Sequence, residues 1–336
     1  MNMFASHFSE HIKGLIEQKQ VLGYKYDSQT KMLKRFDTFC MEFFPNAIVL
    51  DKDIITRWAS LRKGEHPATL ETRISPINEL ARFIIRKGEY ACILPKGMLP
   101  RKIKYTPYIF GDKELKNLFE AIDNTCKFCY EVPLRHIVIP VFFRLLYCCG
   151  LRVSEARLLK LEDVNLENGV ITLVRTKFGK HRQVPLSSEL HSRFNSFFSM
   201  VHTTSKPDDW FFPGLRGMPM TIGNINHNFR RFLWNAGISH CGRTKIGERG
   251  APNVHSLRHT FAVNCLRKWM KQGKNLHAYL PVLQEFMGHV QFSDTAYYLH
   301  FSIDMAQDIR LGLEEKVGFI IPSVSSKKEG NHEKSN

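Results

Sequence analysis

The segment MGHVQFSDTAYYLH, residues 287–300, holds several side chains that are able to take part in group transfer. Tyr297 and Tyr298 follow a Gly–His pair, and His300 stands two residues beyond the second tyrosine. A phenol can act as a covalent nucleophile, and an imidazole can accept or donate a proton. On a helix, adjacent side chains point about 100° apart, so only one tyrosine can face a given cleft. The spacing alone does not say which one, and two core aromatics remain an alternative.

The residues before the tyrosines predict how this segment is held. LPVLQEFMGH reads as a helix that ends at Gly288, which would adopt the left-handed conformation there. That geometry would fix the direction in which His289 points. Ser293 or Asp294 is suited to begin a second helix that carries the tyrosines.

Two other segments supply cationic side chains. Arg152 stands in CGLRVSEARLL at a sharp turn between two predicted helices, where Gly150 ends the first of them. A guanidinium and free backbone N–H groups could converge there on one anion. In NVHSLRHTFAVNCL, His255 and Arg258 are three residues apart, which places them on one face of a helix. His259 is given no role.

A hairpin supplies lysines. Residues 169–186, GVITLVRTKFGKHRQVPL, contain two β-rich runs around a turn with Gly179. Lys177 and Lys180 stand at its tip, which could reach into a DNA groove. A lysine beside a leaving oxygen can donate the proton that the departing hydroxyl requires.

These residue types together match the demands of one reaction. Cleaving a DNA phosphodiester without a metal requires positive donors on the nonbridging oxygens, a nucleophile, and a proton donor for the leaving group. Two arginines, two histidines, one lysine and one tyrosine meet these needs. The sequence has no obvious acidic cluster for paired magnesium ions and no G-x-x-x-x-G-K-[ST] phosphate loop. We therefore expect no metal and no cofactor.

The charge of the chain indicates a polyanionic partner. Its 336 residues contain 48 Lys and Arg against 32 Asp and Glu, a formal net charge of +16. A surplus of this size favours nucleic acid first and an acidic membrane second. No basic amphipathic helix or lipidation signal supports a membrane, and the most apolar stretch is interrupted by Pro140 and Arg144. The sequence therefore predicts double-stranded DNA as partner and no membrane.

The eight cysteines are scattered, which is typical of a cytosolic protein without a disulfide framework. Cys126 and Cys129 form a single C-x-x-C, to which we assign no function. The predicted location is cytoplasmic, in association with the nucleoid.

Hydrophobic periodicity predicts a mainly α protein with a small β-hairpin or sheet, an α+β fold. The predicted parts are a helical domain over 1–93, a basic linker over 94–108, a second domain over 109–322 and a disordered polar tail over 323–336.

The linker, LPKGMLPRKIKYTPY, combines prolines with the basic cluster Arg101, Lys102 and Lys104. Such a segment suits a strap laid along a phosphate backbone, and a solvated connector is the alternative. We treat these three residues and Lys180 as candidate DNA-binding residues.

The order and the amino-acid sequences of these segments resemble those of the tyrosine recombinase (phage integrase) family. GLRVSEARLLKLEDV is similar to the first-arginine motif, TKFGKHRQVPL to the β-hairpin, HSLRHTFA to the H-x-x-R box, and FMGHVQFSDTAYYLH to the nucleophile box. The register of this resemblance selects Tyr298 over Tyr297, and Lys177 over Lys180. It implies six catalytic residues, namely Arg152, Lys177, His255, Arg258, His289 and Tyr298. Ser256 departs mildly from the pattern, because an acidic residue is common there.

The resemblance covers residues 106–305 clearly and the N-terminal helices more loosely. It implies a two-domain architecture, with a helical core-binding domain and a catalytic domain that clamp duplex DNA. Tyr298 would become joined to a 3′-phosphate, and a 5′-hydroxyl of a partner duplex would reseal the strand without ATP.

The expected reaction is site-specific integration, excision or transposition of a mobile element. It implies a homo-tetramer on DNA, with other recombinases or accessory DNA-bending proteins as further partners. Three alternatives are a type IB topoisomerase, a catalytically silent DNA-binding protein of the same fold, and a metal-dependent nuclease or transposase.

Overall fold

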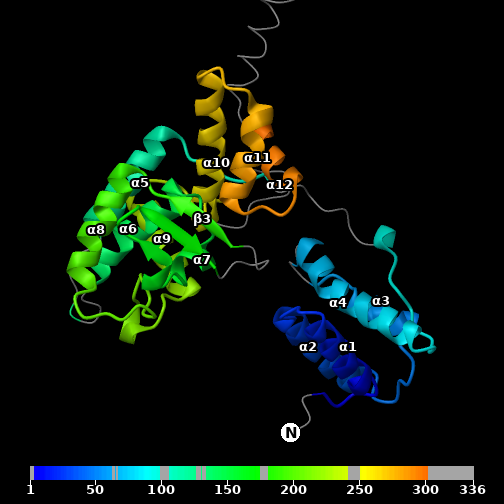
Figure 1. Ribbon diagram of the computed structural model, residues 1–336. Coiled ribbons are helices and arrows are strands. Elements are labelled where there is room, and N and C mark those ends of the chain that lie inside the picture. Colours follow the sequence, from blue (N-terminus) through cyan, green and yellow to red (C-terminus); the bar gives the residue numbers. More distant parts are fainter. Residues whose placement is uncertain are drawn as a thin grey trace, which may run out of the picture. The chain divides into compact units, whose positions relative to one another are not determined.

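The computed structural model describes residues 4–62, 65, 67–98, 106–125, 130, 134–174, 181–240 and 250–301. The chain divides into two compact units, Met1–Tyr105 and Thr106–Asn336 (Figure 1). The predicted mainly α fold with a small antiparallel sheet is confirmed. The boundaries predicted within 94–108 and at 322 stay predictions. The hairpin tip, Arg101, Lys102, Lys104, Cys126, Cys129 and the polar tail lie outside the described residues.

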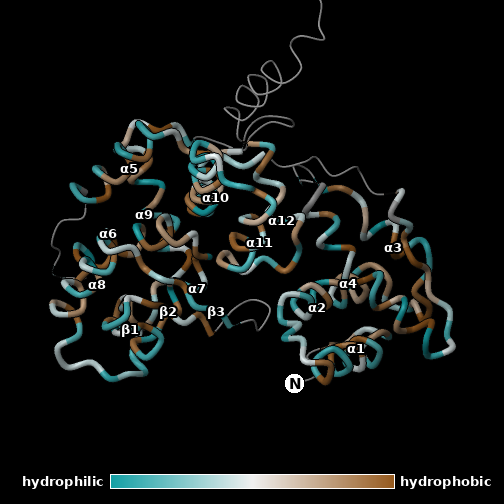
Figure 2. The backbone as a smooth tube through the Cα atoms, turned by 45° about the horizontal axis from the view of Figure 1, so that its top comes forward, coloured by the Kyte–Doolittle hydropathy of each residue, from teal (hydrophilic) through white to brown (hydrophobic). Residues whose placement is uncertain are grey.

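The first unit is helical. Its elements are α1 (Ser9–Val21), α2 (Asp27–Phe43), α3 (Lys52–Trp58), α4 (Pro67–Arg86) and the 3-10 turn η1 (Lys96–Met98). In Figure 2, hydrophobic and hydrophilic stretches alternate along α1 and α2, as amphipathic helices require. Their apolar faces pack on α4 around a core that includes Ile12, Phe36 and Leu80.

Two buried polar groups tie this unit together. The carboxylate of Asp37 accepts hydrogen bonds from the backbone N–H groups of Ala5 and Ser6, at 2.9 and 3.0 Å. The guanidinium of Arg73, also buried, pairs with Glu65 at 2.8 Å. Hydrogen bonds offset the cost of burying the charge of Asp37, and an ion pair offsets that of Arg73.

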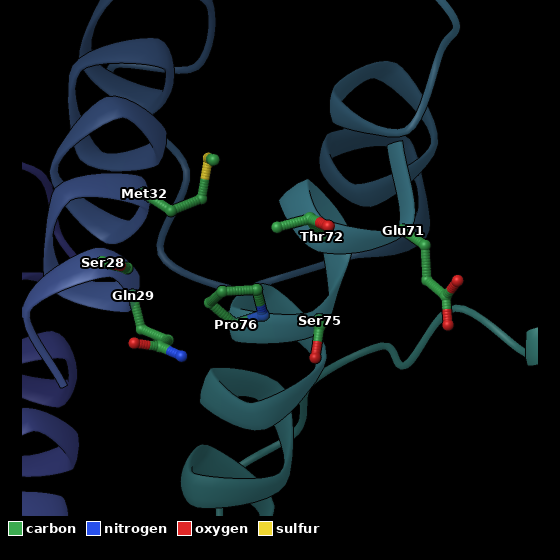
Figure 3. A pocket seen from close by; sticks show the side chains of 7 residues that line it. All are labelled: Ser28, Gln29, Met32, Glu71, Thr72, Ser75 and Pro76. Atoms are coloured by element: carbon green, nitrogen blue, oxygen red, sulfur yellow. The ribbon is translucent and has the colours of Figure 1, made fainter. Parts of the chain in front are cut away.

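Pro76 lies inside α4, a point that the sequence left open. A proline has no N–H, so it cannot donate the usual helical bond to the residue four positions earlier. A cavity of about 390 Å³ lies here between α2 and α4 (Figure 3). Its lining is mostly uncharged and polar, and consists of Ser28, Gln29, Met32, Glu71, Thr72, Ser75 and Pro76. It contains none of the predicted catalytic residues.

The second unit begins with three helices, α5 (Asp112–Thr125), α6 (Arg135–Cys148) and α7 (Val153–Arg157). After the 3-10 turn η2 (Leu161–Asp163) come the strands β1 (Val164–Asn165), β2 (Val170–Leu173) and β3 (Arg182–Pro185), in the order β1-β2-β3 and antiparallel. Ile171 pairs with Val184, and both are fully buried.

The chain continues with α8 (Ser188–Val201), the 3-10 turn η3 (Leu215–Gly217) and α9 (Ile222–Asn235). The last elements of the described part are α10 (Val254–Lys271), α11 (Leu276–Met287), α12 (Phe292–Ala296) and the 3-10 turn η4 (Tyr297–Phe301). Figure 1 shows α10, α11 and α12 side by side. The elements β1 and α8 were not predicted from the sequence. The helix predicted to begin at Ser293 or Asp294 and to carry the tyrosines begins instead after Gln291, and the tyrosines lie on the 3-10 turn η4 that follows it.

Two apolar clusters hold the second unit. The larger cluster joins α5, α6, α8, α9 and the sheet, and includes Phe142, Phe143 and Phe229. The smaller cluster lies among α10, α11 and η4, and includes Leu266, Met287 and Tyr298. No helix among the described residues is both long and apolar enough to span a membrane.

Gly150 ends α6 with a positive φ of 56°, and a Cβ atom there would lie 2.4 Å from the ring of Phe261. We therefore expect Gly150→Ala to combine left-handed strain with a steric clash and to lower the unfolding free energy by about 2–4 kcal/mol. Calorimetric unfolding of the full chain would measure this effect.

Gly237 is the matched control, because its φ is 70° and a Cβ atom would meet nothing within 4 Å. Gly237→Ala should cost only about 1 kcal/mol. Equal losses in the two variants would show that contact with Phe261 does not matter.

Candidate active site

Five of the six predicted catalytic residues line one cavity of about 480 Å³ in the second unit. These residues are Arg152, His255, Arg258, His289 and Tyr298. Lys177, the sixth, and the candidate DNA-binding residues Arg101, Lys102, Lys104 and Lys180 lie outside the described residues. His259, Ser293, Asp294 and Tyr297 complete the lining.

Arg152 is held at the N-terminus of α7. Its backbone N–H donates to Glu155 Oε2 at 2.9 Å, and its Nη1 donates to Glu155 Oε1 at 2.8 Å. Its Nη2 donates to the carbonyl of Gly288 at 2.8 Å. The guanidinium is thus fixed between the first turn of α7 and the end of α11.

Arg258 lies on α10 and is 2% exposed. Its Nη1 donates to the carbonyl of Gly150 at 2.5 Å, and its Nη2 donates to the carbonyl of Met287 at 2.7 Å. Burial and the nearby charge of Arg152 lower the pKa of Arg258 to about 10, so it stays charged at neutral pH.

Arg182 on β3 contributes a third guanidinium beside Glu155 and the end of α11. It was not singled out from the sequence. Its Nε donates to the carbonyl of Phe286 at 2.9 Å. Its Nη1 and Nη2 donate to the two carboxylate oxygens of Glu155 at 3.0 and 2.9 Å. Both side chains of this pair are buried. Arg182 therefore joins β3, α7 and α11.

The end of α11 is the common anchor of the three arginines. The carbonyls of Phe286, Met287 and Gly288 accept from Arg182, Arg258 and Arg152 respectively. The last carbonyls of a helix have no partner within it and carry the negative end of its dipole, so guanidinium donors stabilise them.

Gly288 has a left-handed conformation, as the sequence predicted, with φ 65° and ψ 45°. A Cβ atom there would lie 2.6 Å from Nη1 of Arg182. Glycine is thus required both by the backbone conformation and by the close approach of the guanidinium.

The turn at Gly288 leads directly to His289, which is buried. Its Nδ1 lies 2.8 Å from Oγ1 of Thr295, with which it shares a hydrogen bond. Burial and the charges of Arg258 and Arg152 lower the pKa of His289 to about 3, so the ring is neutral at pH 7.

His255 lies in the first turn of α10 and is exposed to solvent on one side. Surrounding protein, together with the charges of Arg258 and Arg152, lowers the pKa of His255 to about 4. This second imidazole is therefore also neutral at pH 7.

The two tyrosines differ in their surroundings. Tyr298 is 3% exposed, and its hydroxyl lies 3.0 Å from Nδ1 of His259. Burial raises the pKa of Tyr298 to about 12, although Arg258 opposes this rise. Tyr297 packs its ring edge to face against Phe301, with centroids 4.9 Å apart. The structure thus places the hydroxyl of Tyr298 in contact with a group that can accept its proton.

Besides Arg182, three contributors to this site were missed from the sequence, and two of these three left a signal. Glu155 stands three residues after Arg152, the spacing of a capping box. His259 is four residues after His255, hence on the same helix face. Thr295 gave no such sign. Among the described residues, no group of three or more His, Cys, Asp or Glu side chains could hold a metal ion.

The profile of the phage integrase family matches residues 110–304, which is more than half of the chain. The chain belongs to this family, that of the tyrosine recombinases. It is 27% identical over 321 residues to y4rB of Sinorhizobium fredii, a protein named as an integrase/recombinase, covering 93% of this chain and 98% of the relative. It is 30% identical over 228 residues to the tyrosine recombinase XerD of Proteus mirabilis, covering 67% of this chain and 64% of XerD.

Solved structures of recombinases share the fold. The Tn1549 transposon integrase, solved in complex with a circular intermediate DNA, gives a TM-score of 0.62 at 18% identity, over 90% of this chain and 99% of that one. The XerH site-specific recombinase, solved in a post-cleavage complex with its difH substrate, gives 0.61 at 19% identity, over 91% of this chain and 84% of that one.

The buried pair of Glu155 and Arg182 predicts a large stability effect. Glu155→Gln would leave Arg152 and Arg182 without their counter-charge, and we expect the unfolding free energy to fall by about 3–5 kcal/mol. Denaturant unfolding would measure it. Glu162→Gln is the control, because Glu162 is half-exposed and its partner Lys160 lies 3.6 Å away. That variant should change the unfolding free energy by at most about 1 kcal/mol. An equally small change in Glu155→Gln would contradict the assignment.

The same carboxylate predicts a pH dependence of stability. Burial alone would raise the pKa of Glu155, but the hydrogen bonds and charges of Arg182 and Arg152 outweigh it and lower the pKa from 4.5 to about 2. Since the unfolded chain takes up this proton first, the contribution is complete above pH 4.5 and is lost as the pH falls toward 2. Unfolding of the wild type in this window should carry a slope of about 1.4 kcal/mol per pH unit from this group. A wild-type slope equal to that of Glu155→Gln would contradict it.

Proposed function

We propose that this chain is a site-specific recombinase that cuts and rejoins double-stranded DNA through a 3′-phosphotyrosyl link to Tyr298. One observation carries the proposal: two arginines, two histidines and a phenol, contributed by distant segments of the chain, line one cavity. The DNA complexes of the XerH recombinase and the Tn1549 integrase support DNA as the partner.

The two arginines hold the scissile phosphate. A guanidinium has five N–H groups, and the guanidiniums of Arg152 and Arg258 each donate through Nη1 and Nη2 to protein atoms. The remaining donors can reach the nonbridging oxygens, where charge-assisted bonds are strongest. Because both side chains are already fixed, little reorganisation is needed as charge develops in the transition state.

The proposed bond changes use these side chains together with Lys177. The phenolic oxygen of Tyr298 forms a bond to phosphorus, and the bond from phosphorus to the 5′-oxygen breaks. The phenol loses its proton to a neighbouring base, while Lys177 gives a proton to the departing 5′-oxygen. His255 and His289, neutral at pH 7, support the phosphate and move protons.

The reaction needs no ATP, because the phosphotyrosyl link keeps the free energy of the broken bond. A 5′-hydroxyl of a second duplex reverses the step and reseals the strand. It needs no metal, because the arginines supply the positive charge that the phosphate requires. Exchange between two duplexes requires four cuts, so the active form is a homo-tetramer on DNA.

The biological reaction is integration, excision or transposition of a mobile element. The name of the Sinorhizobium fredii relative, which aligns over 93% of this chain, supports this role. Other recombinases or DNA-bending proteins serve as further partners. The basic cluster Arg101, Lys102 and Lys104, together with Lys180, contacts the phosphate backbone, so affinity falls steeply with salt.

Tyr298→Phe should abolish the covalent adduct and leave DNA binding intact, whereas Tyr297→Phe should retain the adduct. The substrate is a pool of duplexes with randomised sequence and one nick, from which the short cleaved strand diffuses away and leaves the protein trapped. Denaturing electrophoresis detects the adduct, and sequencing of the trapped DNA gives the target for later assays.

An adduct that survives in Tyr298→Phe would disprove the assignment of the nucleophile. No adduct from the wild type across the pool would disprove the proposed function. Relaxation of a supercoiled plasmid that carries the recovered site, without strand exchange between two such sites, would instead indicate a topoisomerase.

A further inference from the structure

His259 is the one group that the structure places in hydrogen-bond contact with the hydroxyl of Tyr298 among the described residues. The distance from its Nδ1 to the phenolic oxygen is 3.0 Å, and the ring centroids are 5.6 Å apart. His259 lines the same cavity as Arg152 and Arg258. The roles given to the arginines, to His255 and to His289 leave this contact unexplained.

The direction of this hydrogen bond follows from burial. Tyr298 is 3% exposed, so its proton needs an acceptor inside the protein, and an unpaired buried donor is costly. Burial and the nearby His255 and Arg258 lower the pKa of His259 to about 3, so the imidazole is neutral and offers an acceptor nitrogen. A phenol that donates to Nδ1 satisfies both groups, with the imidazole proton on Nε2.

The position of His259 aims the phenol at the cavity. His259 follows Arg258 directly on α10 and lies one turn after His255, whose ring centroid is 4.6 Å from its own. η4, which carries Tyr298, packs against α10. The hydroxyl of Tyr298 is therefore directed toward the helix turn that presents Arg258 and His255, rather than along the apolar cluster in which its ring is buried.

We propose that His259 is a positioning residue for the nucleophile, and that its Nδ1 holds the phenol of Tyr298 in the orientation from which it attacks the phosphate. This inference rests on the proposed function. It assigns to His259 a role separate from that proposed for His255, which is to support the phosphate, and from that of His289, whose Nδ1 is bonded to Thr295.

Three variants of the full chain test this role. His259→Leu removes the acceptor. His259→Asn keeps an acceptor oxygen close to the place of Nδ1, whereas His259→Gln moves it outward, close to the place of Nε2. The assay is the single-turnover rate of adduct formation on the nicked duplex recovered from the randomised pool. Binding to the same duplex and the thermal midpoint are measured beside it.

We expect His259→Leu and His259→Gln to slow adduct formation by roughly 10- to 100-fold with unchanged DNA binding, and His259→Asn to stay within about threefold of the wild type. The difference between Asn and Gln decides the matter even if His259→Leu fails to fold. The inference is overturned if Asn and Gln are equally slow, if all variants match the wild type, or if loss of the acceptor accelerates attack. These outcomes presuppose a wild-type adduct, whose absence would refute the proposed function and this inference with it.

Discussion

The site depends on the C-terminal turn of α11, whose last carbonyls are capped by guanidinium groups. The three pairs are Phe286 with Arg182, Met287 with Arg258, and Gly288 with Arg152. A helix end of this kind offers acceptors in a fixed geometry and the negative end of a dipole, so it gathers cations that would otherwise repel one another. The segments that deliver them, α7, β3 and α10, are far apart in the sequence.

The negative charge of Glu155 reduces the electrostatic repulsion among these guanidiniums. Among the described residues, its carboxylate accepts hydrogen bonds from the guanidiniums of both Arg182 and Arg152. Three guanidiniums against the two carboxyl groups of Glu155 and Asp294 leave a formal positive charge at the site before any substrate enters. Burial and the charges of Arg258 and Arg152 lower the pKa of His289, so its imidazole stays neutral. The cavity thus presents positive charge to an anion, and hydrogen bonds within the protein fix the guanidiniums before an anion binds.

Much of the fold and of the site could be predicted from the sequence, and the parts that could not be predicted depend on tertiary contacts. Helical spacing placed His255 and Arg258 on one face, and glycine chemistry predicted the turn at Gly288, because both signals are local. The role of Arg182 was not predicted, because its partners, Glu155 and Phe286, lie on other elements and its own strand has the sequence of an ordinary hairpin strand. His259 was dismissed because a histidine beside Arg258 gains meaning only when η4 folds against α10. The tyrosines fell on η4 instead of α12 because five residues cannot specify helix type without their tertiary contacts.

The account is tested most directly by locating the atom that joins protein to DNA. The trapped adduct is digested with nuclease and trypsin, and the peptide spanning residues 275–310 is sequenced by tandem mass spectrometry. The prediction is a nucleotide mass carried by Tyr298 alone. A nucleotide found on Tyr297, or on a residue outside the cavity that Arg152 and Arg258 line, would contradict the claim that this cationic cavity serves the phenol of Tyr298.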